Sequence, residues 1–421
     1  MDRDRKSKDN VDEFEKVHAD VLADGMPSWS ERELKSKFAD ERKTRAGIDK
    51  PYLVLTLLLL LIGLIMLLSA SFSSAMFRSQ VVFAVIGIVL MLVVSRFSSK
   101  LISRWSTHLL LASIALLILV LVIGIRVNGA TRWLGVGGVE HTFSFQPSEV
   151  AKLAIILAFA QMSAKFGETR MRTIRYGFLP FAAITAVIMI LLWRQPHVSA
   201  VIIVGVTAVI MMFTGGTRLR YFILSAIVIA LVAWIFLVSD MFELTGLGHW
   251  GRRIDIWLNP EADPLGGGFQ VRQSLNAIGS GGMLGQGLGL SRQKHQYLPE
   301  EHNDFIFAIV AEELGFVGAI MILCLFALLV VRGFWLALNA KDRYSSLIVI
   351  GISSLLAVQV FINVAVVTSL IPATGVALPL FSSGGTALMI QLVQMGIVLA
   401  VSREIPAYKE ADRNTKQECL T

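Results

Sequence analysis

The chain has 421 residues, of which 55% are hydrophobic and only 16% are charged, and its formal net charge is +7 at pH 7. About a quarter of the residues of a soluble globular protein are charged, so this composition excludes a soluble domain, a disordered chain and a disulfide scaffold. In a membrane protein Lys and Arg gather in cytoplasmic loops, so the positive charge does not call for a nucleic-acid partner. The composition predicts an integral membrane protein.

The predicted elements begin after a charged N-terminal segment. Residues 1–50 are rich in Asp, Glu, Lys and Arg, which predicts a cytoplasmic tail that is mostly disordered. About ten apolar blocks follow, each near the roughly 20 residues that cross a bilayer. They cover residues 52–72, 79–96, 107–126, 147–164, 177–194, 198–216, 220–239, 303–332, 345–370 and 384–402. We predict an all-α polytopic membrane domain over 51–405 and a second cytoplasmic tail over 406–421.

The basic loops set the predicted orientation. Lys and Arg concentrate in the alternate connections around 96–104, 165–175, 218–220 and 332–343. Alternate loops share a side, and by the positive-inside rule that side is the cytoplasm. Both termini are then cytoplasmic, and the long loop 240–302 between the seventh and eighth spans lies outside. Its Trp, Ile and Phe residues predict that it packs against the protein.

Ionisable residues in or beside spans are costly, so each is a candidate functional residue. Glu149 and Lys152 lie three residues apart on one helical face and can pair, either as a structural staple or as part of a site. Arg132 lies beside Trp133 in the preceding outer loop. Its guanidinium suits a phosphate, while the Trp suits an interfacial anchor. His197, at another polar break, is a weak signal when taken alone.

A glycine-rich stretch late in the outer loop opens the richest polar region. It runs from Gly279 to Gly289 and would let backbone N–H groups approach an anion. It lacks the Lys-Ser/Thr of a P-loop, so a flexible turn is the alternative. Arg292 and Lys294 follow it. Asp304 stands at the outer mouth of the eighth span, where a carboxylate near cations is suited to accepting a proton from a hydroxyl.

Two further polar features lie beyond Asp304. Glu312 and Glu313 lie deeper in the same span, and at least one of them must face the bundle interior. Between the last two spans, the uncharged stretch from Pro372 to Gly385 predicts a re-entrant turn lined by neighbouring helices.

At these residues the sequence resembles the SEDS family of shape, elongation, division and sporulation proteins, which includes FtsW, RodA and SpoVE. The matching pieces run in family order from about residue 50 to 405, and they look more like FtsW and SpoVE than RodA. They are Phe145-Gln146-Pro147-Ser148-Glu149 with Lys152; Asp263-Pro264-Leu265-Gly266; Ala277 to Gly282; Gly287-Leu288-Gly289 with Ser291, Gln293 and Lys294; Tyr297-Leu298-Pro299-Glu300; Asp304-Phe305-Ile306-Phe307; Ala311 to Gly315; and Pro372 to Gly385.

The sequence departs from the family pattern at two places. Family members often carry Gln-Pro-Asp where this chain has Gln195-Pro196-His197, so the acid is missing. They also often carry Ser-Tyr-Gly-Gly where this chain has Ser382-Ser383-Gly384-Gly385, so a ring and its hydroxyl are missing. The charged tail 1–50 lies outside the resemblance.

The resemblance implies a peptidoglycan glycosyltransferase that polymerises lipid II into glycan strands and releases polyprenyl diphosphate, in cell division or sporulation. Its place would be the bacterial cytoplasmic (inner) membrane. The implied partners are a class B penicillin-binding protein, which crosslinks the product, and other divisome or elongasome proteins. Asp304 would be the catalytic base, by match to the family's essential acid. The residues expected to bind the substrate and its diphosphate are Arg132, Glu149, Lys152, Arg292 and Lys294.

Other residues of the matching motifs are expected to shape the loops around this site. They are Gln146, Pro147, Ser148, Gly281, Gly282, Glu312, Glu313, Pro372 and Gly375. A divalent cation, Mg²⁺ or Mn²⁺, would assist the leaving group, although no ligand set can be read from the sequence.

Two other functions belong to different classes. A lipid II flippase would place its key charges at the bilayer midplane with access from both sides, whereas Asp304, Arg132 and Arg292 map to the outer face. A non-catalytic scaffold for the penicillin-binding protein would depend on its partner-facing spans and not on Asp304.

Overall fold

The computed structural model describes residues 47–70, 74–127, 130–136, 143–227, 248–263, 266–293 and 303–405. All of these residues belong to one compact unit, Ala46–Ile405. The predicted tails lie almost entirely outside the described residues, and so does most of the seventh predicted span, of which residues 220–227 are helical.

Helices occupy the other predicted spans. The described chain contains 8 helices that are long and apolar enough to cross a membrane, and a shorter apolar helix over Val198–Thr214. The helices are α3 (Lys50–Ala70), α4 (Ser74–Val94), α5 (Ser99–Ile123), α6 (Pro147–Met171), α7 (Leu179–Arg194), α8 (Val198–Thr214), α12 (Ile306–Leu338), α13 (Arg343–Val367) and α14 (Gly385–Ser402). A short π-helical turn, Ile174–Phe178, leads into α7. The prediction of a helical polytopic membrane protein is confirmed.

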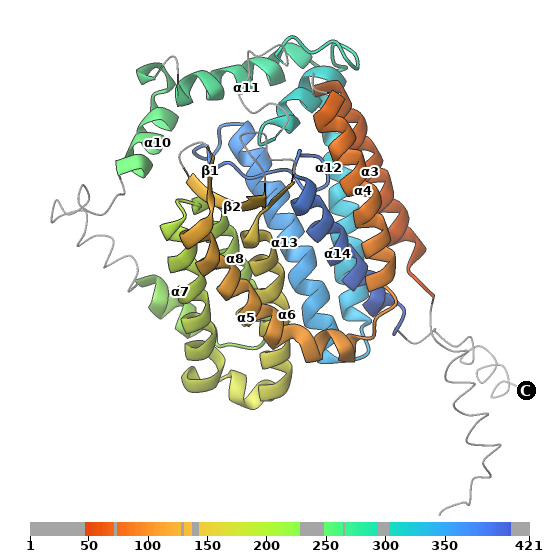
Figure 1. Cartoon of the computed structure of the whole chain (residues 1–421), viewed down its shortest axis with the longest axis vertical. Coiled ribbons are helices and arrows are strands. Elements are labelled where there is room, and N and C mark those ends of the chain that lie inside the picture. The colour runs from red at the N-terminus through yellow and green to blue at the C-terminus, as the bar shows by residue number, and fades with distance from the viewer. Residues whose placement is uncertain are drawn as a thin grey trace, which may run out of the picture. The chain divides into compact units, whose positions relative to one another are not determined.

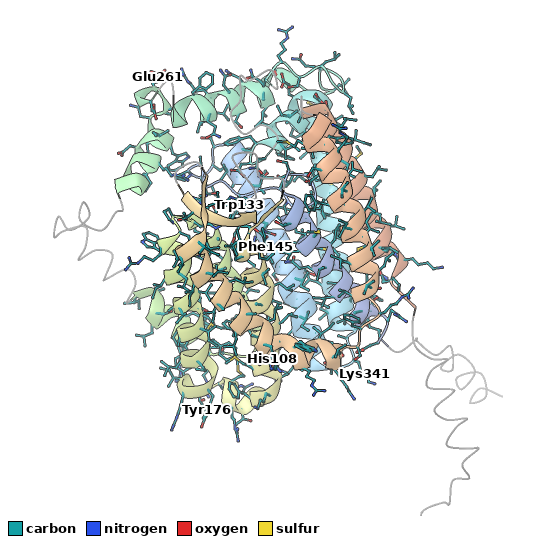
Figure 2. The ribbon with its side chains drawn as sticks, viewed as in Figure 1. His108, Trp133, Phe145, Tyr176, Glu261 and Lys341 are labelled. Carbon is teal, nitrogen blue, oxygen red and sulfur yellow. The ribbon has the colours of Figure 1, made fainter. Side chains whose placement is uncertain are left out.

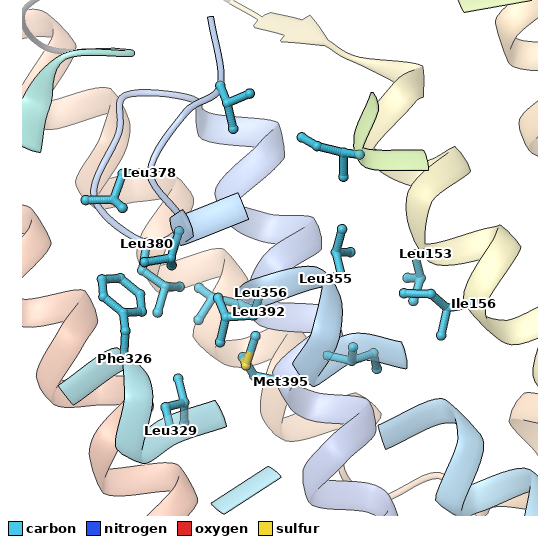
Figure 3. Close-up of a cluster of buried hydrophobic side chains, with 14 of the residues drawn as sticks. Leu153, Ile156, Phe326, Leu329, Leu355, Leu356, Leu378, Leu380, Leu392 and Met395 are labelled. Carbon is cyan, nitrogen blue, oxygen red and sulfur yellow. The ribbon is translucent and has the colours of Figure 1, made fainter. Parts of the chain in front are cut away.

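The centre of the bundle is formed by α6, α13 and α14, whose residues are mostly buried. Figure 3 shows Leu153, Leu355 and Leu392 from these helices in one apolar cluster. By contrast α4 and α5 leave large apolar side chains such as Val82 and Val122 exposed. Lipid is as apolar as these side chains, so their exposure costs nothing in a bilayer and close packing must hold the helices together.

One end of the bundle is fastened by Asp49. Its Oδ1 accepts a hydrogen bond of 2.9 Å from the Tyr52 N–H and so caps α3. Its Oδ2 lies 2.5 Å from Nη2 of Arg332 on α12, and its backbone N–H donates to Oγ of Ser402 on α14 at 3.2 Å. A single residue therefore joins three helices at the end that carries the basic connection after α12.

A small sheet at the other end was not predicted. Its strands β1 (Ile125–Val127), β2 (Ala130–Val136) and β3 (Phe143–Phe145) are antiparallel in the order β1-β2-β3, between α5 and α6 (Figure 1). Leu134 pairs with Phe145 across β2 and β3. Two of the strands have three residues each, which is too few to show the alternation that identifies a strand.

The outer segment packs as expected and contains helices that the sequence analysis did not predict. They are α10 (Gly248–Leu258), the 3₁₀ turn Pro260–Ala262 and α11 (Gly267–Gly281), which lie across the end of the bundle that carries the sheet (Figure 1). Trp257 donates its Nε1–H to the Ser369 carbonyl at 2.8 Å. Ser274 donates its hydroxyl to the Val367 carbonyl at 2.7 Å. These contacts fix the outer helices to the chain that follows α13.

Candidate active site

Asp304 lies in a turn directly before α12 and is held there by Asn363 of α13. The fully buried Asn363 donates its Nδ2 hydrogens to the Asp304 carbonyl at 2.8 Å and to the Val376 carbonyl at 2.6 Å. An amide has two such hydrogens, so one side chain fixes the backbone of the acid and the segment between α13 and α14 together. Nothing in the sequence indicates these long-range partners of Asn363.

The carboxylate of Asp304 lies against Gly375. The backbone of Gly375 has φ +72°, in the left-handed region, and a Cβ there would lie 3.0 Å from Oδ2 of Asp304. Glycine satisfies both requirements because it has no Cβ. On the other side, Ser199 at the start of α8 donates its hydroxyl to the Thr374 carbonyl. Pro372 lies in the same segment, so the predicted re-entrant stretch does line the acid.

Arg132 of β2 lies within electrostatic reach of Asp304. It donates an Nη2 hydrogen to the Pro196 carbonyl. Burial and the nearby positive charge of Arg253 lower the pKa of Arg132, while the negative charge of Asp304 raises it. Arg253 in turn donates to the Ala373 carbonyl at 2.7 Å. The acid therefore has the Arg132 guanidinium within electrostatic reach, and Arg253 lies next to Arg132. An arginine stays charged at any physiological pH.

Glu149 and Lys152 form the predicted pair in the first turn of α6. Their Oε2 and Nζ atoms are 2.8 Å apart and both side chains are buried. A carboxylate in the first turn also interacts favourably with the helix dipole. Gln146, just before the helix, places its Nε2 3.4 Å from Nε2 of His197. This contact joins the start of α6 to the start of α8.

His197 is buried beside these cations. Burial, then the charge of Arg132, then the charge of Lys152 lower its pKa to about 3. The imidazole is therefore neutral near pH 7 and contributes hydrogen bonds without charge. In the sequence His197 is a weak signal when taken alone. Its place at the start of a span, close to Arg194, is the feature that could have identified it.

Glu312 and Glu313 hold the loop that contains Ser291 to Gln293. Glu312 accepts hydrogen bonds from the Arg292 N–H at 3.0 Å and from the Ser291 hydroxyl. Glu313 accepts from the hydroxyl of Ser69 on α3 at 2.6 Å. Both side chains are 1% exposed. We call this group, Ser69, Ser291 to Gln293, Glu312 and Glu313, the glutamate latch.

The glycine-rich stretch docks onto a break in α12 at Gly315. The N–H groups of Gln286 and Gly287 donate to the carbonyls of Glu312 and Glu313, both at 3.0 Å. A Cβ on Gly281 would overlap the Ala311 carbonyl. These N–H groups are already paired with α12, so the interpretation of the stretch as an anion cradle is wrong for them. The alternative of a flexible turn also fails, because the stretch is hydrogen-bonded to a helix.

The residues predicted to bind the diphosphate do not all lie in one cluster. Arg132 and Lys152 lie around Asp304 and His197. Arg292 lies in the glutamate latch with an exposed side chain, and no described contact links it to Asp304. Lys294 lies outside the described residues. Of the predicted loop residues, Pro147 occupies the first turn of α6, where its missing N–H costs nothing, and Ser148 is buried beside it.

Figure 2 places this cluster in the molecule. Trp133 and Phe145 mark the sheet, on the side of the bundle toward Glu261 and away from His108, Tyr176 and Lys341. Within the described residues no group of three or more His, Cys, Asp or Glu side chains is placed to hold a metal ion. The acids near Asp304 do not supply such a set, because Glu149 is paired with Lys152. The Mg²⁺ or Mn²⁺ requirement stays a prediction, and no chemical step is assigned to it.

Residues 50–406 match the family model of FtsW, RodA and SpoVE, described as "Cell cycle protein". Stage V sporulation protein E of Bacillus subtilis is 41% identical over 367 residues, covering 84% of this chain and 97% of that protein. The probable peptidoglycan glycosyltransferase FtsW of Trichlorobacter lovleyi is 39% identical over 369 residues, covering 85% and 93%.

Solved structures are also similar. One describes how a peptidoglycan synthase complex coordinates polymerization and crosslinking, with TM-score 0.70, 29% identity, and coverage of 86% of this chain and 99% of that chain. Another is the rod shape determining protein RodA of Thermus thermophilus, with TM-score 0.62, 28% identity, and coverage of 85% and 97%. This chain is therefore an integral membrane protein of the SEDS family, to which FtsW, RodA and SpoVE belong.

Proposed function

We propose that this chain is a peptidoglycan glycosyltransferase that polymerises lipid II into glycan strands with release of polyprenyl diphosphate. The observation that carries the proposal is the partly exposed Asp304, whose carboxylate lies against Gly375 and within electrostatic reach of the Arg132 guanidinium. The names of the FtsW relatives support the activity. The sporulation relative supports a role in sporulation or division.

The reaction needs a base and an anion site on opposite faces of the donor sugar. Asp304 accepts the proton of the acceptor hydroxyl as its oxygen attacks the anomeric carbon of the donor. A new C–O bond forms there while the bond to the diphosphate oxygen breaks, and the electron pair leaves with the diphosphate. The proton then passes from Asp304 to water. Because the leaving group is α-linked, attack from the opposite face gives a β-linked glycan.

The cations of the cluster stabilise the charge that develops on the leaving group. Arg132 offers planar N–H donors that match phosphate oxygens. Lys152 is held by Glu149, so it contributes a fixed charge at the start of α6. Groups fixed in advance of the reaction cost no reorganisation when charge develops on the substrate. The folded bundle supplies this preorganisation through Asn363 and Gly375.

The same proposal includes location and partners. The chain lies in the bacterial cytoplasmic membrane with both termini in the cytoplasm, which the distribution of Lys and Arg supports. It works with a class B penicillin-binding protein that crosslinks its product. The similar solved structure, a complex in which polymerization and crosslinking are coordinated, supports this pairing.

The test is polymerisation of lipid II by the full-length protein in proteoliposomes, with and without a class B penicillin-binding protein. We expect wild type to form polymer and Asp304→Asn to lose it while keeping its fold and its partner. Glu261→Gln is the control, because Glu261 is an exposed acid of the same outer segment. Full polymerisation by Asp304→Asn would remove Asp304 as the base. Lipid II transfer across the bilayer without polymer would favour the flippase.

A further inference from the structure

Five buried polar atoms around Asp304 have no hydrogen-bond partner among the residues that the structure describes. Four of them can donate a hydrogen bond, namely Arg132 Nε, Ser148 Oγ, His197 Nδ1 and Thr374 Oγ1, and the fifth is the acceptor Asn363 Oδ1. Buried polar groups in native proteins are almost always paired, so a group of orphans in one place points to a ligand that supplies the partners. Elsewhere in the bundle such atoms occur singly, as at Ser163 on α6 and Thr207 on α8.

The four donor residues belong to one cluster although they come from separate elements. Arg132 binds the carbonyl of Pro196, the residue before His197. His197 contacts Gln146, two residues before Ser148. Ser199 binds the carbonyl of Thr374, whose neighbour Gly375 lies against Asp304. The orphan atoms therefore surround the start of α8 beside the proposed base.

The contact with Gln146 fixes which nitrogen of His197 carries the proton. The nitrogen of a side-chain amide can only donate, so Nε2 of a neutral His197 must accept the hydrogen from Gln146 Nε2. The proton of the ring then lies on Nδ1. Since burial and the neighbouring cations keep the imidazole neutral by lowering its pKa to about 3, Nδ1–H is a buried donor that needs an acceptor.

The charge around these donors selects the kind of acceptor. Arg132, Lys152 and Arg253 are cationic, whereas Glu149, the partner of Lys152, and Asp304 are the two acids of the cluster, so one positive charge is left over. The N-termini of α6 and α8 also meet here, and both favour negative charge. A neutral sugar would satisfy the donors but not the charge. Phosphate oxygens satisfy both.

We propose that Arg132 and His197 form the subsite for the diphosphate of the polyprenyl-linked substrate, completed by the hydroxyls of Ser148 and Thr374. The inference rests on the proposed function and deepens it. It assigns the leaving group to this cluster and not to Arg292, whose main chain is held in the glutamate latch and which no described contact links to Asp304.

Binding separates this inference from catalysis. The full-length Asp304→Asn protein in phosphatidylcholine nanodiscs is titrated with undecaprenyl diphosphate, and binding is followed by native mass spectrometry. Undecaprenol is the uncharged probe, and inorganic pyrophosphate tests whether the headgroup binds alone. We expect undecaprenyl diphosphate to bind, pyrophosphate to compete with it, and undecaprenol to bind at least about tenfold more weakly, a difference of about 1.4 kcal/mol.

Substitutions at His197 test the donor. In the Asp304→Asn background, His197→Phe keeps a ring and removes the N–H, so we expect about tenfold weaker binding of undecaprenyl diphosphate. His197→Asn restores a neutral N–H donor and should bind within about threefold of the parent. Undecaprenol binding should not respond to either change. Equal binding of undecaprenyl diphosphate by the parent and His197→Phe would overturn the subsite. It would also be overturned if Arg292→Ala weakened this binding and His197→Phe did not.

Matched serines provide the control. Ser148→Ala should weaken undecaprenyl diphosphate binding, whereas Ser163→Ala, which removes an equally orphaned hydroxyl from the same helix, should not. Equal effects of the two changes would contradict the subsite. If wild type forms no polymer but binds diphosphate through His197, the proposed function fails and the subsite stands. If polymer forms but His197→Phe binds like its parent, only the subsite fails.

Discussion

Two groups of acids near the start of α12 have opposite surroundings. Glu312 and Glu313 are fully buried and accept hydrogen bonds from backbone N–H groups and hydroxyls of other segments. Asp304 is partly exposed and lies beside Gly375, within electrostatic reach of the Arg132 guanidinium. An acid inside a membrane protein is a functional candidate by default. The contrast shows that the surroundings of a buried acid distinguish a structural role from a functional one. An acid that accepts hydrogen bonds from main-chain N–H groups stabilises the fold, whereas a partly exposed acid beside a cation is available to a substrate.

The largest expected effect separates the two groups by activity. Asp304→Asn should lower lipid II polymerisation by at least about 100-fold, the low end of what a general base contributes. Its unfolding midpoint in detergent should match wild type, because the Asn363 contact is to the Asp304 backbone. Polymerisation rates and thermal unfolding of the same preparations are the measurements. A large loss of stability would show that Asp304, like Glu312 and Glu313, has a structural role.

Glu312→Gln should show the reverse pattern. The amide has one acceptor oxygen where Glu312 offers two to Ser291, Arg292 and Gln293. Leaving buried donors unpaired should cost about 2 kcal/mol of unfolding free energy. Hydrogen exchange at residues 291–293 should rise. Glu261→Gln is the exposed control. Unchanged hydrogen exchange at residues 291–293 in Glu312→Gln would show that Glu312 does not hold this loop.

The pH dependence of stability tests His197. Its folded pKa of about 3 lies below the ordinary value of 6.5, so the unfolded state binds the proton more readily. The associated stability is present above pH 6.5 and is lost as the pH falls from there toward 3. Between pH 7 and 5 we expect a loss of about 2 kcal/mol in wild type, measured by chemical denaturation. The slope should flatten in His197→Asn, and an identical slope in the variant would refute the buried neutral imidazole.

The smallest expected effect concerns Gly375. Gly375→Ala combines left-handed strain with a Cβ beside the Asp304 carboxylate, so we expect about 1 kcal/mol lower stability and a severalfold lower kcat. Gly289→Ala carries the same kind of strain, with φ +82°, but its Cβ would meet open space. It should lose stability without the change in kcat. Equal kcat values for the two variants would show that the position of Gly375 beside the Asp304 carboxylate does not matter for catalysis.

Much of this arrangement could be predicted from the sequence. Long apolar blocks identify spans by length alone, and the Glu149 and Lys152 pair follows from helical spacing. Asp304 and Arg132 could be grouped because both stand at ends of spans that are predicted to lie on the same side of the membrane. These signals are local, and each is carried by residue type.

Other features have no local signal. The three-residue strands are too short to recognise, and Asn363 is an ordinary polar residue until its partners 59 and 13 positions away are known. Arg292 was grouped with Asp304 by charge and proximity in sequence. The structure instead uses its main chain, because two buried glutamates next to it in space need N–H donors.

The way Glu312 binds the chain has a consequence for sequence variation. It accepts hydrogen bonds from the backbone of residues 292 and 293, and every amino acid except proline offers the same N–H. At position 292 the side chain is exposed, so the fold places little demand on which side chain stands there. Any selection that preserves an exposed basic residue at 292 must act through something outside the fold, so the tolerated substitutions there would report on encounters with lipid or partner proteins.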